Sequence, residues 1–111
     1  MNLTAPAAPA AALPVLGQIL VSTWGYDQTN ADFYRVMKVS PTQVTLASMK
    51  AIEVPHNGDW MFGVKTPYGA GVGTPFRRKF VASGNGYWVG ITSFSGARLW
   101  DGKPVNVSHT A

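Results

Sequence analysis

FYRVMKVSPTQVTLASM, residues 33–49, is the stretch that decides the fold. In its second half the apolar residues Val44 and Leu46 alternate with polar ones, which is the period of two expected of a strand with one buried face. Its first half, residues 33–39, is rich in β-branched and aromatic residues. Pro41 separates the two halves because proline cannot donate a ladder hydrogen bond. Residues 33–49 therefore predict a β-hairpin.

Similar patterns on both sides of this hairpin predict more strands. We expect strands at residues 16–23, 76–81 and 87–92, and shorter ones at residues 60–65 and 105–107. The sequence Ser83-Gly84-Asn85-Gly86 predicts a tight turn, since Asn and Gly tolerate positive φ.

Two stretches lack a regular pattern. Proline and glycine interrupt residues 56–75 so often that we predict a long loop there, poorly ordered over residues 68–74. Residues 93–99 fit either a bend or a single helical turn. Five or six short strands predict an all-β fold, a small, partly open, SH3-like barrel.

Length and composition favour one domain. The 111 residues are 46% hydrophobic and only 13% charged, so the chain can collapse around a core. We expect a single β domain over residues 15–108, preceded by a disordered Ala/Pro-rich arm at residues 1–14 and followed by a tail at residues 109–111. The arm lacks the basic start and the uninterrupted apolar stretch of a signal peptide, and no apolar run is long enough to span a membrane.

The side chains also limit the chemistry. The sequence has no cysteine and two histidines, so thiolate chemistry is excluded and neither a metal site nor a cofactor is expected. His56 and His109 have no obvious orienting partner for a catalytic triad. We therefore expect a non-enzymatic protein. The weakest alternative is an enzyme in which Asp27 and Asp32 act as a pair of catalytic carboxylates.

The formal charge of +4 permits binding to nucleic acid or to an acidic protein surface. Arg77, Arg78 and Lys79 form the one basic run, between Phe76 and Phe80. On a strand, alternation places Arg78 on the face of the two phenylalanines and the other two cations on the opposite face.

Further cations and aromatic side chains complete a candidate nucleic-acid surface, in which cations bind phosphates and rings stack on bases. The residues predicted to bind nucleic acid are Arg77, Arg78, Lys79, Arg35, Lys38 and Trp88, with Arg98 and Lys103 as further cations. Two alternatives remain open. The charges can protect an exposed strand from aggregation, or Arg77 or Arg98 can pair internally with an aspartate.

A second cluster, at residues 24–34, combines aromatic rings with polar side chains, as binding pockets do. The candidate partner-binding residues are Trp24, Tyr26, Asp27, Gln28, Asn30 and Trp100. The alternative is a structural corner in which Asp27 and Asn30 cap the turn and the rings fill a small core.

Two motifs, WGYDQTNADFY at residues 24–34 and ARLWDGKPV at residues 97–105, occur in this order with PFRRK at residues 75–79 between them. Together they resemble a family of small uncharacterised proteins from bacteriophages and mobile elements, commonly of actinobacteria. The resemblance covers residues 16–110 and implies a phage-encoded protein in the host cytoplasm, without assigning catalytic residues. We expect an accessory protein that acts by binding, with nucleic acid as the leading partner and a host protein or self-assembly as the alternative.

Overall fold

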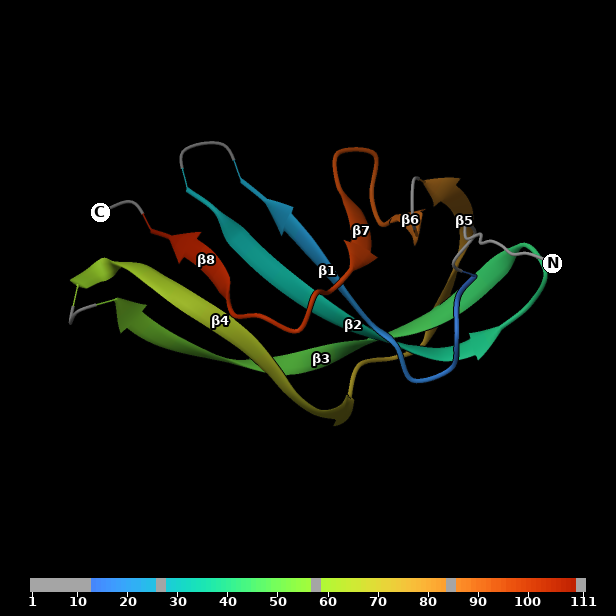
Figure 1. The fold of residues 1–111 in the computed structure, drawn as a ribbon, viewed down its shortest axis with the longest axis horizontal. Coiled ribbons are helices and arrows are strands. Elements are labelled where there is room, and N and C mark those ends of the chain that lie inside the picture. The colour runs from blue at the N-terminus through green and yellow to red at the C-terminus, as the bar shows by residue number, and fades with distance from the viewer. Residues whose placement is uncertain (1–12, 26–27, 57–58, 84–85, 110–111) are drawn as a thin grey trace, which may run out of the picture.

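In the computed structural model, residues 13–25, 28–56, 59–83 and 86–109 are described, and they form eight β-strands and no helix. The strands are β1 (Ile19–Trp24), β2 (Asn30–Val39), β3 (Gln43–His56), β4 (Asp59–Gly71), β5 (Phe76–Ser83), β6 (Gly86–Gly90), β7 (Gly96–Leu99) and β8 (Val105–Ser108). All neighbouring strands pair antiparallel. The predicted all-β fold is confirmed, and the predicted hairpin is formed by β2 and β3 (Figure 1).

Six of the strands close into a barrel, in the order β2-β1-β7-β6-β5-β3, because β3 pairs back with β2. Residues 44–49 of β3 pair with β2 on one side, while residues 43–46 pair with β5 on the other. This closure leaves the barrel part of the sheet without an open edge.

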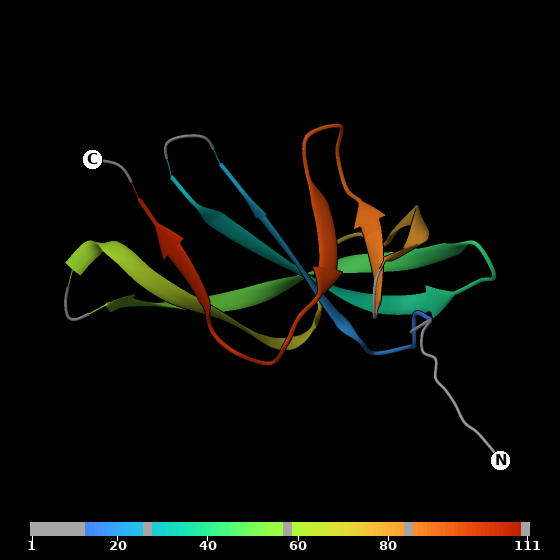
Figure 2. The ribbon, with the colours of Figure 1, turned by 45° about the horizontal axis from the view of Figure 1, so that its top comes forward.

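Two further strands extend the sheet beyond the barrel. Residues 49–56 of β3 pair with β4, and the other edge of β4 carries β8. Figure 2 shows this extension at the opposite end of the molecule from β5 and β6. The strand β3 therefore belongs to the barrel at its start and to the extension at its end.

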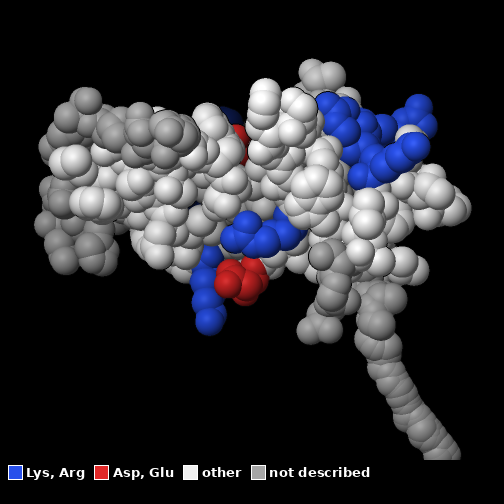
Figure 3. Space-filling view, turned by 90° about the horizontal axis from the view of Figure 1, so that it is seen from above, with Lys and Arg blue, Asp and Glu red and all other residues white. Residues whose placement is uncertain are grey.

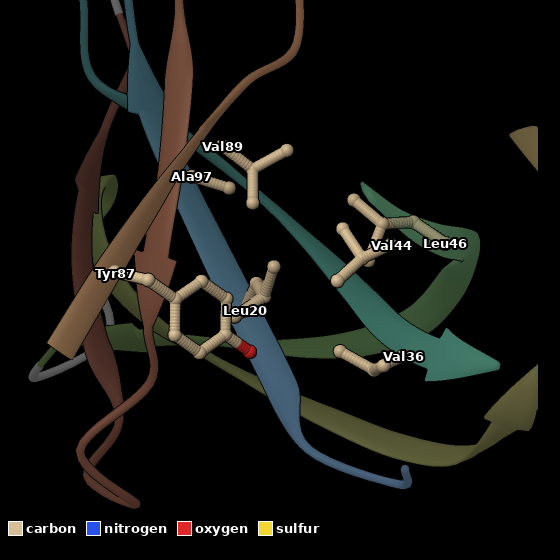
Figure 4. Packing of buried hydrophobic residues seen from close by; sticks show 7 residues of the cluster. All are labelled: Leu20, Val36, Val44, Leu46, Tyr87, Val89 and Ala97. Atoms are coloured by element: carbon tan, nitrogen blue, oxygen red, sulfur yellow. The ribbon is translucent and has the colours of Figure 1, made fainter. Parts of the chain in front are cut away.

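The barrel interior holds one hydrophobic core, with side chains from β1, β2, β3, β6 and β7 pointing toward one another (Figure 4). Its buried members are Leu20, Val36, Val44, Leu46, Tyr87, Val89 and Ala97. The hydroxyl of Tyr87 donates a 2.7 Å hydrogen bond to Gln18 Oε1, and burial raises the pKa of this phenol to about 12. Tyr87 is therefore a neutral core residue at physiological pH.

A second core lies between β1 and β2 of the barrel and the extension. It buries Val21, Ala31, Phe33, Met49 and Val107. The ring of Trp100 packs edge-on against Phe33, with centroids 5.9 Å apart. Consecutive residues of a strand point to opposite faces, so both faces of these central strands are covered.

The prediction of a long loop over residues 56–75 is wrong, because β4 continues through Gly71 and pairs with β3. Glycines at the end of β4 and just after it allow the chain to approach β3 closely. A Cβ at Gly71 would lie 2.7 Å from that of Ala47, and one at Gly73 would lie 2.8 Å from Ser48 Oγ. A register shift between Met49 and Lys50 marks a bulge, where glycine is common.

Two other local predictions have a mixed outcome. Of the two alternatives for residues 93–99, the bend is present at residues 93–94, while residues 96–99 form strand β7, which was not predicted. The strands β5 and β6 form the predicted hairpin, with Ser83 opposite Gly86, while residues 84–85 of its turn lie outside the described residues. Most of the predicted Ala/Pro arm, residues 1–12, also lies outside them. No helix long and apolar enough to cross a membrane occurs in the described ranges.

Candidate nucleic-acid interface

Three predicted cations meet on the outer face of the barrel. Thr45 of β3 pairs with Lys38 of β2 on one side and with Arg77 of β5 on the other. Residues paired across strands point to the same face, so Lys38, Thr45 and Arg77 form one row. In the next row Gln43 pairs with Lys79. All three cations are exposed.

An open groove follows these rows. Met37, Lys38, Val39, Ser40, Gln43, Thr45, Pro75, Phe76 and Arg77 line it. Its walls combine ammonium and guanidinium groups with hydroxyl and amide groups. Such a lining can bind phosphate through charge and through hydrogen bonds.

The other two predicted cations lie differently. Arg35 is on the same outer face, opposite Ala47, but it is half-buried and its guanidinium lies against Gly17. Arg78 faces the phenylalanine side of β5, as alternation predicted, and its guanidinium lies 4.8 Å from the centroid of the Phe76 ring. Arg78 therefore does not belong to the row of Arg77 and Lys79.

Trp88 of β6 is also on the outer face, and its indole is 46% exposed. One side of the ring lies on glycine, since a Cβ at Gly96 would be only 2.0 Å from Cζ2 and 2.2 Å from Cε2 of Trp88. The ring extends over Gly90, where a Cβ would be 3.4 Å from Cζ3. The backbone therefore packs against one side of the indole, and the rest of the ring stays accessible to solvent.

The strands join this ring to the cations. Trp88 pairs directly with exposed Arg98 of β7, and the register that pairs Phe80 with Val89 places Lys79 beside Gly90. We call Lys38, Arg77, Lys79, Trp88 and Arg98 the basic strip. Figure 3 shows Lys and Arg side chains gathered, without Asp or Glu among them, at the barrel end of the molecule.

The positive charge of the strip is not neutralised by a described partner. Among the residues that the structure describes, one ion pair occurs, between His109 and Glu53 of the extension. Neither Arg77 nor Arg98 forms an ion pair with Asp32 or Asp101. The described residues thus do not support the alternative of internal pairing for these two arginines.

The candidate partner-binding residues separate into two places. Trp24 is exposed near the mouth of the barrel, and its Nε1 donates a 2.7 Å hydrogen bond to Asp32 Oδ2. Trp100 instead packs in the second core and donates to the backbone oxygen of Lys103 at 2.7 Å, which is a structural role. The two tryptophans therefore do not form one surface.

The loop between these strands is only partly described. Gln28 and Asn30 are half-buried near the start of β2. Tyr26 and Asp27 lie outside the described residues, and so does the predicted carboxylate pair of Asp27 with Asp32.

Sequence reasoning missed the two glycines under Trp88 and the polar residues Thr45 and Gln43 between the cations. Their role depends on which strands are neighbours, and nothing in their local sequence indicates it. The described part of the chain contains no group of three or more His, Cys, Asp or Glu arranged to hold a metal ion. The chain matches no family model, no curated protein and no solved structure.

Proposed function

We propose that the protein binds single-stranded nucleic acid along the basic strip. The observation that carries this proposal is the Trp88 indole, packed against Gly96 beside cations without ion-pair partners among the described residues. An indole with one supported and one free side suits stacking of an unpaired base. Duplex bases are already stacked on one another, which favours a single strand as the ligand.

Phosphate contacts supply most of the affinity in this proposal. Lys38 and Arg77 lie on strands that flank β3, so their Cα atoms are about 10 Å apart at normal strand spacing. Lys79 follows Arg77 on the same face of β5, and Arg98 lies across from Trp88. A strand that follows this path meets cations before and after the stacking ring.

The test is fluorescence anisotropy with labelled single-stranded and double-stranded oligonucleotides of mixed sequence, at low and at physiological salt. We expect tighter binding of the single strand, and weaker binding at the higher salt. Replacing Trp88 with alanine removes a stack of about 1–3 kcal/mol, which corresponds to a 5- to 150-fold rise in Kd.

A matched control is Lys50→Gln. Lys50 is an exposed lysine on the outer face of the β3–β4 extension, opposite Tyr68 and outside the strip. Its replacement removes the same charge as Lys79→Gln but should change the affinity less. Absence of binding at low salt, or equal effects of the two lysine variants, would contradict the proposal.

A second candidate function is binding to a host protein or to another copy of the chain. It is favoured by an apolar outer face on β3 and β4, where Ile52, Val54, Phe62 and Tyr68 are all about half exposed. An apolar surface of this kind is typical of interaction sites. A monomer in light scattering and no specific protein captured from host lysate would argue against it.

The bacteriophage origin and the host-cytoplasm location remain proposals that rest on the two sequence motifs. An antibody against the protein, applied to fractions of phage-infected actinobacterial cells, tests both. Signal in the soluble cytoplasmic fraction only after infection is the expected result, and signal in uninfected cells or in the culture medium would contradict it.

A further inference from the structure

A separate cleft lies at the mouth of the barrel, on the inner side of the strands that form the strip. Its lining includes Trp24, Asp32, Tyr34, Ile91, Thr92 and Phe94. Three aromatic rings face it from three segments of the chain. Phe94, in the loop between β6 and β7, is 96% exposed, which is unusual for so large an apolar side chain.

Hydrogen bonds hold the walls of this cleft in place. The bond from Trp24 Nε1 to Asp32 Oδ2 fixes the indole, and no described residue bonds to Asp32 Oδ1. The backbone N–H of Phe94 donates to Thr92 Oγ1 at 3.1 Å. The cleft therefore presents an indole held by a hydrogen bond, a loop backbone held at Phe94, and a carboxylate that can still accept hydrogen bonds.

A buried hydroxyl lies beside the cleft. Ser22 is 1% exposed and pairs with Asp32 across β1 and β2, and its Oγ has no hydrogen-bond partner among the residues that the structure describes. A buried polar atom of this kind costs stability and often marks a functional site. It belongs to the strand pair that carries Asp32, behind the residues that line the cleft.

The surroundings favour a flat ligand with N–H donors over a cation. Arg78 donates from Nε to the backbone oxygen of Ile91, one of the lining residues, and so brings positive charge to the edge of the cleft. This charge offsets part of the attraction of Asp32 for a cationic ligand. Tyr34 has a raised pKa, mainly because of burial and then because of Asp32, so its hydroxyl is neutral and can donate or accept.

Arg78 also connects the cleft to the basic strip, because it lies between Arg77 and Lys79 on β5. The side chain of Arg78 lies on the opposite face of β5 from Arg77 and Lys79, so a strand bound along the strip has to turn around β5 to reach the cleft. One base of the strand can then leave it and stack between the aromatic walls.

We propose that this cleft is a base subsite that prefers guanine, stacked between Trp24 and Phe94 and bound through Asp32. Guanine is the base with an N1–H and an exocyclic amine side by side, which two carboxylate lone pairs can accept. Uracil and thymine place carbonyl oxygens beside their N–H, and these are repelled by the carboxylate. The proposal rests on the nucleic-acid function of the strip.

The test compares guanosine monophosphate with inosine monophosphate on the full chain. Both ligands carry the same phosphate, so a difference reports the exocyclic amine alone. The probe is the Nε1–H resonance of Trp24 in a nuclear magnetic resonance titration. We expect guanosine monophosphate to shift this resonance and to bind about 10-fold more tightly, because the lost bond is to a charged group.

Two variants identify the site. Phe94→Ala, at an exposed position that does not affect the core, should weaken guanosine monophosphate binding about 5-fold or more. Asp32→Asn should remove the preference over inosine monophosphate. Trp88→Ala, in the strip, should leave that preference unchanged.

The outcomes separate the two proposals. Oligonucleotides that bind with no preference for guanine, together with an unshifted Trp24 resonance, would overturn the base subsite and leave the strip intact. Nucleotide binding that depends on Asp32, without any oligonucleotide binding, would overturn the strip as the path of a strand. Equal binding of both nucleotides in the wild-type protein would also overturn the preference for guanine.

Discussion

Replacing Gly96 with alanine should dislodge the Trp88 ring without altering any charge. The new Cβ would lie 2.0 Å from Cζ2 and 2.4 Å from Nε1 of the indole, where carbon contacts are favourable only near 3.5–4.0 Å. The backbone of Gly96 is paired with Gly90 in the sheet, so the indole must move instead. The ring then loses its support on the barrel surface.

The cost of this movement follows from the buried part of the ring. Trp88 is 46% exposed, so about half of its surface is covered. With about 250 Å² for a tryptophan and ~25 cal/mol per Å², complete exposure costs about 3 kcal/mol. Alanine loses less backbone entropy than glycine on folding, which offsets about 0.5–1 kcal/mol of this cost. We expect the free energy of unfolding to fall by about 2 kcal/mol.

The effect on binding is measured separately, under conditions where the variant is fully folded. Urea unfolding followed by circular dichroism gives the stability, and anisotropy with a single-stranded oligonucleotide gives the affinity. We expect the affinity of Gly96→Ala to fall toward that of Trp88→Ala. The control is Gly90→Ala, whose Cβ would lie 3.4 Å from the ring, which needs little adjustment. Wild-type stability and affinity in Gly96→Ala would refute the supported-ring geometry.

Three further predictions concern the fold and the extension. Burial raises the pKa of Tyr87 from 10.0 to about 12, so this group stabilises the fold below pH 10 and the contribution is lost as pH rises through 12. The urea midpoint should therefore fall more steeply with rising pH for the wild type than for Tyr87→Phe. Parallel curves for the two proteins would contradict this. Phe33→Ala should cost about 3–5 kcal/mol in urea unfolding, since Phe33 is fully buried in the second core, and a loss below 1 kcal/mol would show that this core is not packed as described. Ile52→Lys, on the exposed face of β3, should leave stability within about 0.5 kcal/mol and abolish any concentration-dependent association in light scattering, and association unchanged by the lysine would place the contact elsewhere.

The sequence predicted the parts of the fold that depend on local pattern. The alternation around Val44 and Leu46 places both in the barrel core. The same alternation on β5 correctly separates Arg78 from Arg77 and Lys79. These predictions succeed because the period of two follows directly from the geometry of a strand.

The parts that depend on tertiary contacts could not be predicted. The glycines of residues 69–73 look like a loop in the sequence, but Gly71 and Gly73 lie where β4 and the chain after it pack closely on β3. Gly96 looks like a turn residue and instead makes room for Trp88. In both cases glycine is needed because a residue distant in sequence packs closely against it. This role can be predicted only when the register of the sheet is known.

In the candidate site, too, some features could be predicted from the sequence and others depend on tertiary contacts. Sequence reasoning selected Arg77, Lys79, Lys38 and Trp88, which the structure places on the outer face of the barrel. It also grouped Trp100 with Trp24, although Trp100 packs in the second core. Residue type identified the side chains that could form a binding site, and strand order decided which of these side chains are neighbours.

The most direct test of the central claim is the dependence of single-strand affinity on salt concentration. Four cations in contact with phosphate, Lys38, Arg77, Lys79 and Arg98, predict a slope of log K against log salt near −2.8, at about −0.7 per phosphate. The double variant Arg77→Gln with Lys79→Gln should reduce the slope to about −1.4. A wild-type slope near zero, or a slope unchanged in the double variant, would contradict binding of nucleic acid along the basic strip.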